Sequence, residues 1–148
     1  MQGAGSRGIH QSWLNGMDMK SKIENYRDLK VWQLGMEITR QVYEATKCFP
    51  KDEQFDLTSQ MRRAASSIPA NLAEGHSRSS TKDYLRFTSI ALGSLSELAT
   101  FLELSGQMGI GSVEKLRAIY EMTLEERKML RGLQKALRKR LNVVQPDR

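Results

Sequence analysis

The chain has 148 residues, which suits one compact domain or a smaller domain with a tail. Its 23 Lys and Arg residues outnumber its 17 Asp and Glu residues, and the net charge of +6 favours an anionic partner: nucleic acid, an acidic protein or a membrane surface. The single cysteine, Cys48, excludes an intramolecular disulfide, and no apolar run approaches the roughly 18 residues of a membrane span, so we expect a cytoplasmic protein.

Residues 1–25 are rich in Gly, Ser, Asn and Gln, show no hydrophobic period and carry no apolar signal-peptide core. We expect a flexible extension here, in which Met17 and Met19 are alternative natural start sites. We expect a helical domain over residues 26–142 and a C-terminal tail over residues 143–148.

The first predicted helix follows Asp28, which is a good N-cap residue. Apolar and small side chains then recur at three- and four-residue steps from Leu29 to Thr46. We expect this helix to end near Cys48, because Pro50 biases the residue before it away from helical geometry.

The second predicted helix opens after Asp52, and we expect Gly75 to end it. Pro69 lies inside it and lacks the N–H that would bond to the carbonyl of Ala65. This loss costs about 3 kcal/mol unless another donor bonds that carbonyl. The nearest candidates in the sequence are Ser66, Ser67 and Asn71.

The third predicted helix opens at Ser80, with Asp83 in the capping-box position, and runs to about Gly106. The fourth opens at Ser112 and carries leucines to Leu141. No segment shows a strand period, so we expect an all-α, antiparallel up-down four-helix bundle. Two apolar faces are wider than one bundle seam needs, which favours self-association; alternatively, the N-terminal extension covers the extra surface.

Two polar residues, Asn71 and Glu74, follow Pro69 within the second predicted helix. We expect them to fix the packing of this helix on the third rather than to act in catalysis. The candidate charge partners are Arg62, Arg63 and Arg86.

Four sequence blocks carry a family resemblance: "YRDLKVWQLGMEI", "LTSQMRRAASSIPANLAEGHSR", "YLRFTSIALGSLSEL" and "KMLRGLQKAL". They occur in this order and with no large gap over residues 26–140. The chain resembles the four-helix-bundle family encoded by intervening sequences in bacterial 23S ribosomal RNA genes. It departs from the family pattern at Phe55-Asp56-Leu57, where tyrosine-glycine-leucine is more common.

The positions that match the family pattern are structural, and no catalytic role comes with them. Gly93, with Ser89, gives a small-x-x-x-small step that we interpret as a packing contact. The matching positions are Gln60, Arg62, Arg63, Ser67, Pro69, Asn71, Glu74, Gly75, Arg78, Arg86, Phe87, Gly93, Ser94 and Glu97.

The resemblance implies a ring-shaped homo-oligomer, with a pentamer as the expected state. It also implies relation to the accessory proteins of diversity-generating retroelements, which are basic pentameric bundles that bind nucleic acid and a reverse transcriptase. An RNA or DNA ligand and a reverse transcriptase or other protein partner are therefore expectations from the resemblance.

The sequence gives little support for an enzymatic function. His10 and His76 are the only histidines, and neither belongs to a metal-binding spacing; "GQMGIG" lacks the lysine and the preceding strand of a phosphate loop. Glu74 and Glu97 offer a carboxylate pair across two helices, although a buried Glu in a bundle is more often paired with arginine. We expect no metal, no cofactor and no catalytic residue.

A basic run near the C-terminus points to a binding function. Residues 127–140 hold seven cations and no acid, and part of them follow three- and four-residue steps along one helix face. Such a stripe can track phosphates without reading bases, whereas the simpler explanation is that late-helix cations complement the helix dipole and keep the surface hydrated. The predicted contacts are Arg127, Lys128, Arg131, Lys135, Arg138, Lys139 and Arg140, with Arg78 and Lys82.

No aromatic residue interleaves with these cations, so contact is expected to be electrostatic and weakly sequence-specific. A membrane surface is a poor alternative, because the apolar face of that helix is needed inside the bundle. The sequence thus predicts a non-enzymatic, oligomeric nucleic-acid-binding bundle. The alternative is a structural or scaffolding oligomer that binds a protein and no nucleic acid.

Overall fold

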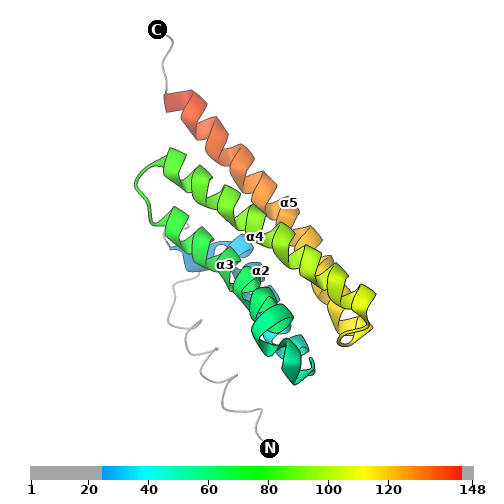
Figure 1. Ribbon diagram of the computed structural model, residues 1–148. Helices are drawn as coiled ribbons and strands as arrows, with labels where there is room; N and C mark the ends of the chain where they lie inside the picture. The colour runs from blue at the N-terminus through cyan, green and yellow to red at the C-terminus, as the bar shows by residue number, and fades with distance from the viewer. Residues whose placement is uncertain (1–24, 145–148) are drawn as a thin grey trace, which may run out of the picture.

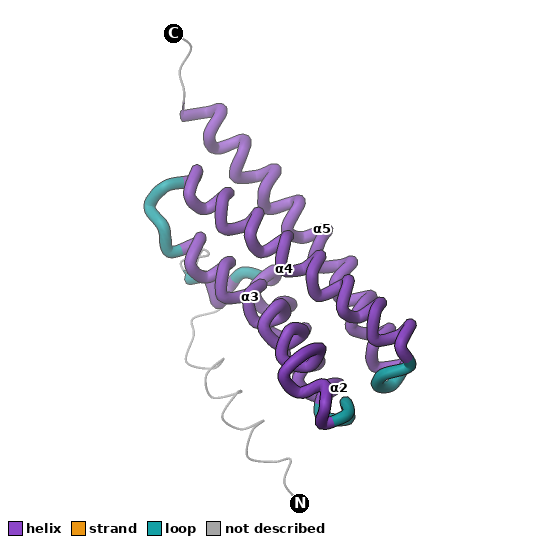
Figure 2. The backbone as a smooth tube through the Cα atoms, in the orientation of Figure 1, coloured by secondary structure: helices purple, strands orange, loops and turns teal. Residues whose placement is uncertain are grey.

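The computed structural model describes residues 25–144, and these form four long helices with short connections (Figures 1 and 2). The predicted antiparallel four-helix bundle is confirmed, and no strand occurs within this range. Residues 1–24 of the extension expected over residues 1–25, and residues 145–148 of the expected tail, lie outside the described part. Asn25 caps the first turn and residues 143 and 144 still belong to the last helix, so the predicted boundaries are each slightly wrong. The helices are α2 (Lys30–Thr46), α3 (Ser59–His76), α4 (Thr81–Met108) and α5 (Val113–Val144), with the short turns η1 (Tyr26–Asp28), η2 (Lys51–Glu53) and η3 (Gln54–Thr58).

Two predicted helix starts are confirmed by hydrogen bonds. The hydroxyl of Ser80 accepts from the N–H of Asp83 at 3.3 Å, and the hydroxyl of Ser112 accepts from the N–H of Lys115 at 3.4 Å. Each hydroxyl satisfies one of the amide groups that the first turn of a helix leaves without a partner. α4 ends at Gly109, whose φ of 68° is readily reached only without a Cβ.

Two other predicted helix ends are wrong. Asp28 belongs to η1, and Leu29 is the N-cap of α2, so the Asp28 side chain does not cap that helix. Gly75 does not end α3, which continues to His76 with a right-handed C-cap at Ser77. Gly75 is instead buried under α4, which explains why this position has no side chain.

The bundle core draws on all four helices. α3 lies against α2 on one side and α4 on the other, and α5 contacts both α2 and α4. The largest fully buried apolar side chains are Ile38 and Val42 of α2, Met61, Ile68 and Leu72 of α3, Leu95 and Leu98 of α4, and Ile119, Leu130 and Leu137 of α5.

The carbonyl that Pro69 leaves free finds its donor on another helix. The hydroxyl of Thr39 on α2 lies 3.1 Å from the carbonyl oxygen of Ala65 and 2.8 Å from that of Gly35, and its single proton is shared between the two acceptors. None of the three candidates named from the sequence bonds to the Ala65 carbonyl. α3 therefore remains helical through a buried proline because α2 replaces the missing N–H.

The polar link from α3 to α4 is made by Ser67, and neither Asn71 nor Glu74, the two residues predicted for this role, bonds to α4. Asn71 donates from its amide to the carbonyl of Ser67 at 2.7 Å and to its hydroxyl at 2.9 Å. The Ser67 hydroxyl in turn lies 2.8 Å from that of Ser94 on α4. This short chain of hydrogen bonds fixes the register between the two helices.

The two matching glycines have opposite surroundings. A Cβ on Gly75 would lie 2.7 Å from the Cβ of Phe87 and 2.8 Å from Cδ2 of Tyr84. A Cβ on Gly93 would meet nothing within 4 Å, so the predicted packing contact at Gly93 is wrong for the helices of this chain.

This contrast gives a paired prediction. Gly75→Ala is expected to lower the free energy of unfolding by about 1–3 kcal/mol, because α3 and α4 must separate to admit a methyl group. Gly93→Ala is expected to raise it by roughly 0.5–1 kcal/mol, because alanine restricts the unfolded chain and nothing obstructs the methyl group. Urea unfolding of both variants measures the difference; an equal effect at the two positions would contradict the close approach at Gly75.

The wide apolar face predicted for the third helix is mostly used inside one chain, since Thr88, Leu92 and Leu95 are all buried. A smaller set of large apolar side chains does remain exposed on or beside α4 and α5. They are Ile90, Leu104, Met108, Val113, Leu124 and Val143.

Candidate nucleic-acid interface

α5 lies antiparallel to α4, and polar contacts fix the register of its basic half. The buried amide of Gln134 donates to the hydroxyls of Thr88 and Ser89 at 3.1 and 3.3 Å. Arg127 donates to the hydroxyl of Ser96 at 3.1 Å. The end of α5 therefore lies beside the first turns of α4, at the same end of the bundle as the α3–α4 connection (Figure 1).

The predicted α5 cations divide into two groups. Two of them make polar contacts within the chain: Arg127 with Ser96, and Arg131 with the side-chain oxygen of Gln134 at 3.3 Å. The others are exposed and form no ion pair within residues 25–144. These five residues, which we call the basic face, are Lys128, Lys135, Arg138, Lys139 and Arg140.

Arg140 lies near the start of α4. Burial raises the pKa of the Tyr84 phenol, and the charge of Arg140 has a smaller, opposing effect on it. Since Tyr84 is in the first turn of α4, this interaction places the last cation of the basic face at the end of the bundle.

Two more arginines stand at this end, but each has an acidic neighbour. Arg78 pairs with Glu74 at 2.9 Å, and Arg86 lies 3.9 Å from Asp83. Both guanidinium groups also lie over the ring of Phe87, at 5.2 and 4.6 Å from its centroid. The positive charge of Arg78, a predicted ligand contact, is thus partly neutralised by Glu74 within the chain.

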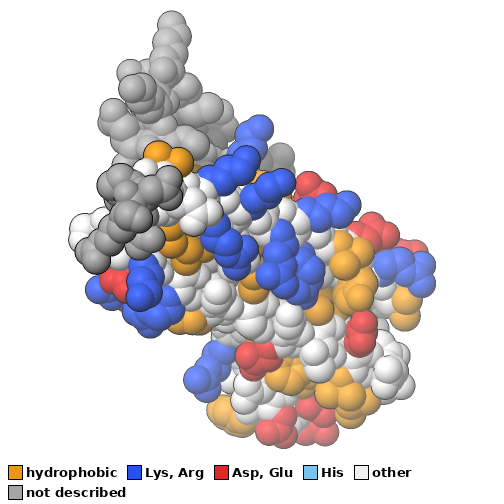
Figure 3. All heavy atoms as spheres, turned by 90° about the horizontal axis from the view of Figure 1, so that it is seen from above, with side chains coloured by type: hydrophobic (Ala, Val, Ile, Leu, Met, Phe, Trp, Pro, Cys, Tyr) orange, Lys and Arg blue, Asp and Glu red, His pale blue; other side chains and the backbone are white. Residues whose placement is uncertain are grey.

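Lys82, the remaining predicted contact, is exposed and makes no ion pair in the described range. It lies in the first turn of α4, close to the end of α5. Figure 3 looks onto this end of the bundle and shows Lys and Arg side chains gathered across its centre, with Asp and Glu side chains toward the margins. Lys82 and the basic face therefore lie at the end of the bundle where basic side chains outnumber acidic ones in this view.

The predicted partners of Glu74 are wrong. Arg62 instead donates to the hydroxyl of Thr46 at 2.9 Å and lies 4.6 Å from the Tyr43 ring centroid, so it joins α3 to α2. Arg63 is exposed. Because Glu74 bonds to Arg78 one turn ahead, the pair needs no second helix.

The proposed carboxylate pair of Glu74 and Glu97 does not form. Both side chains are exposed. Ser67 faces Ser94 and Gly75 faces Phe87, so these two glutamates are separated along the bundle by about ten helical residues. No group of three or more potential metal ligands occurs among the described residues.

One acidic residue that sequence reasoning passed over is the most unusual polar group of the core. Glu126 of α5 is fully buried, and neither carboxyl oxygen has a hydrogen-bond partner. Burial raises its pKa from the ordinary 4.5 to about 8, so the carboxyl is mostly neutral at pH 7. Its Oε1 faces Gly35 of α2, where a Cβ would lie 3.3 Å away.

The spacing of α5 contained a signal for this burial. Ile119, Thr123, Glu126 and Leu130 follow each other at steps of four, three and four residues, and all four are buried. A charged residue in phase with a core stripe was the evidence that Glu126 points inward.

No helix among the described residues is long and apolar enough to cross a bilayer.

Comparison with known proteins gives one family and a similar fold. The family model for the 23S rRNA-intervening sequence protein matches residues 27–132. The chain is also similar to a solved structure from Bacteroides thetaiotaomicron, a protein with unknown function from the S23 ribosomal protein family. The two share 24% sequence identity and a TM-score of 0.66, over 71% of this chain and 98% of that one, which supports the fold alone. No curated protein matches the chain.

Proposed function

Because the chain belongs to the 23S rRNA-intervening sequence protein family, we propose that it is a non-enzymatic bundle that binds RNA or DNA as a homo-oligomer. The expected oligomer is a pentamer, and a role as the accessory subunit of a ribonucleoprotein or reverse-transcriptase complex fits the same resemblance. The proposed ligand contact is the basic face on α5, extended by Lys82.

The observation that carries this proposal is uncompensated charge. The basic face holds five exposed cations on about three and a half turns of one helix, none paired with an acid in the described range. The last turn of α5, where the helix dipole acts most strongly, contains no basic residue, so complementing the dipole does not account for these cations. Lys128, Lys135 and Lys139 share one face of α5, with Arg138 and Arg140 on either side of it, and such a face can meet several phosphates of a nucleic-acid backbone.

The surroundings of these cations favour backbone contact over base contact. The nearest aromatic rings of α4, Tyr84 and Phe87, are buried, so they offer no face for a base to stack on. Arg78 and Arg86 already rest on Phe87. We therefore expect binding that depends on phosphate spacing and little on sequence.

Salt dependence tests this proposal directly. Raising the salt from 50 to 200 mM is expected to weaken binding of a 20-base-pair RNA duplex roughly a hundredfold to a thousandfold, because about five phosphate contacts release counterions. Fluorescence anisotropy with the labelled duplex measures this slope. A salt-independent affinity, or no binding at 50 mM, would contradict the proposal.

A scaffolding oligomer is the second candidate, and the exposed apolar residues on α4 and α5 favour it. Ile90, Leu104 and Leu124 are each at least 40% exposed although they lie in long, regular helices. An oligomer that ignores the duplex at every salt concentration would favour this second function.

A further inference from the structure

The end of the bundle opposite the basic face carries an unusually exposed aromatic side chain. Phe55 lies in the π-helical turn η3 and is 85% exposed, more than any other large apolar residue of the described chain. A single exposed apolar residue needs no explanation by itself. π-helical turns, however, are rare in proteins, and those that occur are often part of a functional site. The surfaces near Phe55 are therefore of interest.

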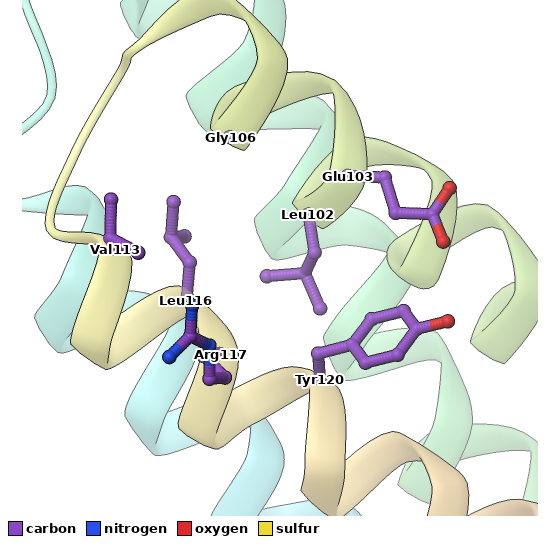
Figure 4. Close-up of a pocket in the computed structure, with 7 residues that line it drawn as sticks. All are labelled: Leu102, Glu103, Gly106, Val113, Leu116, Arg117 and Tyr120. Carbon is purple, nitrogen blue, oxygen red and sulfur yellow. The ribbon is translucent and has the colours of Figure 1, made fainter.

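A cavity of about 350 Å³ opens at this same end, between α4 and α5. Figure 4 shows Leu102 and Leu116 in the space between the two helices, with the carboxylate of Glu103 and the guanidinium of Arg117 at its margins. The volume of the cavity is about twice that of an enclosed cavity that accepts a benzene ring, and it is open to solvent on one side. The cavity has room for a phenyl side chain.

The cavity and Phe55 lie at the same level along the bundle. The α2–α3 connection meets the α4–α5 connection, because a Cβ on Gly111 would lie 2.5 Å from the ring of Phe49. Phe55 follows Phe49 within the first connection, and Val113 of the cavity follows Gly111 just beyond the second. Phe55 is not among the residues that line the cavity and is mostly exposed, so it does not fill the cavity of its own chain.

We propose that Phe55 of each copy inserts into the α4–α5 cavity of the next copy and so forms the contact that repeats around the oligomer. Rotation about an axis parallel to the helices leaves every residue at its own height. It therefore brings Phe55 of one chain level with the cavity of a neighbour. Such a head-to-tail contact closes into a ring when its rotation brings the last copy back to the first. The inference depends on the homo-oligomer of the proposed function and not on nucleic-acid binding.

Opposite charges lie beside the two surfaces, and Glu103 adds one negative charge at the edge of the cavity beside Arg117. Asp52 and Asp56, on either side of Phe55, form no ion pair within the described residues, and the same holds for Arg117 at the edge of the cavity. Bringing Phe55 into the cavity places these opposite charges near each other. An aromatic anchor in a pocket with charges at the rim is the arrangement that dominates many protein interfaces.

Phe55→Ser is expected to raise the dissociation constant of the oligomer by about thirtyfold to a thousandfold, as for the loss of an interface anchor. Sedimentation velocity over a concentration series measures this change. Val143→Ser is the matched control, because Val143 is 83% exposed at the opposite end, and it is expected to leave the mass unchanged. Circular dichroism of Phe55→Ser should match the wild type, since the side chain contacts little of its own chain.

A charge exchange makes the test specific for this pair of surfaces. Asp56→Arg and Arg117→Asp are each expected to weaken the oligomer, and the double variant is expected to recover part of the loss. An oligomer that survives Phe55→Ser overturns this interface but leaves the proposed oligomer standing. A monomeric wild type overturns both, and it leaves the cavity to residues 1–24 or to another protein. Duplex binding is measured in parallel and reports on the basic face alone.

Discussion

The triple variant Lys135→Glu, Arg138→Glu and Lys139→Glu is expected to bind an RNA duplex about a hundredfold more weakly at low salt, and to show a salt slope smaller by about three. Each lost phosphate contact removes about 0.9 from the slope with B-DNA, so three contacts account for the change. All three side chains are exposed and make no ion pair in the described structure. The fold should therefore tolerate the reversal.

A matched control separates a local surface from net charge. Lys30→Glu, Lys51→Glu and Arg63→Glu reverse three other exposed cations. Each reversal removes two charges, so either triple variant takes the net charge from +6 to 0. The control is expected to keep most of the affinity and the slope. Equal losses in the two variants would show that the molecule attracts the duplex by overall charge, and the basic face would lose its special role.

Arg131 is left out of this variant for a structural reason. Its guanidinium donates to Gln134, whose buried amide donates to Thr88 and Ser89 on α4. Reversing Arg131 would disturb that network as well as any ligand contact. Its effect on binding would then be hard to separate from an effect on the packing of α5.

The helices were predictable because their boundaries are local. Ser80 and Ser112 mark helix starts through their own hydroxyls, and the apolar steps between such caps repeat at the helical period. The predicted helix start at Asp28 was wrong because a separate short turn begins at Asn25, whose side chain accepts from the N–H of Arg27. Competing local caps of similar strength cannot be ranked from the sequence alone.

The interactions around Pro69 were less predictable because they join residues far apart in the chain. Thr39 stands 26 residues before Ala65, and only the packing of α2 on α3 brings its hydroxyl to that carbonyl. The pair of Glu74 and Arg78 was accessible, since a spacing of four residues on a helix favours it. The partner of Glu74 was predicted wrongly because arginines elsewhere in the bundle were preferred to Arg78.

The run of cations on α5 was visible in the sequence. Which of these cations make contacts within the chain and which remain free for a ligand was not. The hydrogen bond of Arg127 to Ser96 depends on the register between α4 and α5, and Arg131 bonds within α5 to Gln134, whose amide reaches Thr88 and Ser89 of α4. Once the register is known, the five cations without partners stand apart from the two that help hold α5 in place.

Glu126→Gln is expected to stabilise the protein at pH 7 by about 3 kcal/mol relative to wild type, and by almost nothing at pH 4. Burial raises the pKa of Glu126 from 4.5 to about 8 in the folded protein. Between these two pH values the unfolded chain releases the proton and the folded chain keeps it. The free energy of unfolding of the wild type therefore falls as pH rises, by about 1.4 kcal/mol per unit, and levels off above pH 8.

Glutamine has the shape of the protonated acid and no charge to lose, so this fall is absent from the variant. Urea unfolding at fixed protein concentration across pH 4 to 9 measures the difference between the two proteins, in which all other titrating groups cancel. Glu125→Gln is the control, because Glu125 is next to Glu126 in the sequence but its side chain is exposed. The difference in unfolding free energy between this variant and the wild type is expected to be flat with pH. A flat difference for Glu126→Gln, or a loss of stability at pH 7, would mean that the buried carboxylate is ionised and has a partner. Gly35 would then be opposite a structural ion and not opposite a neutral acid.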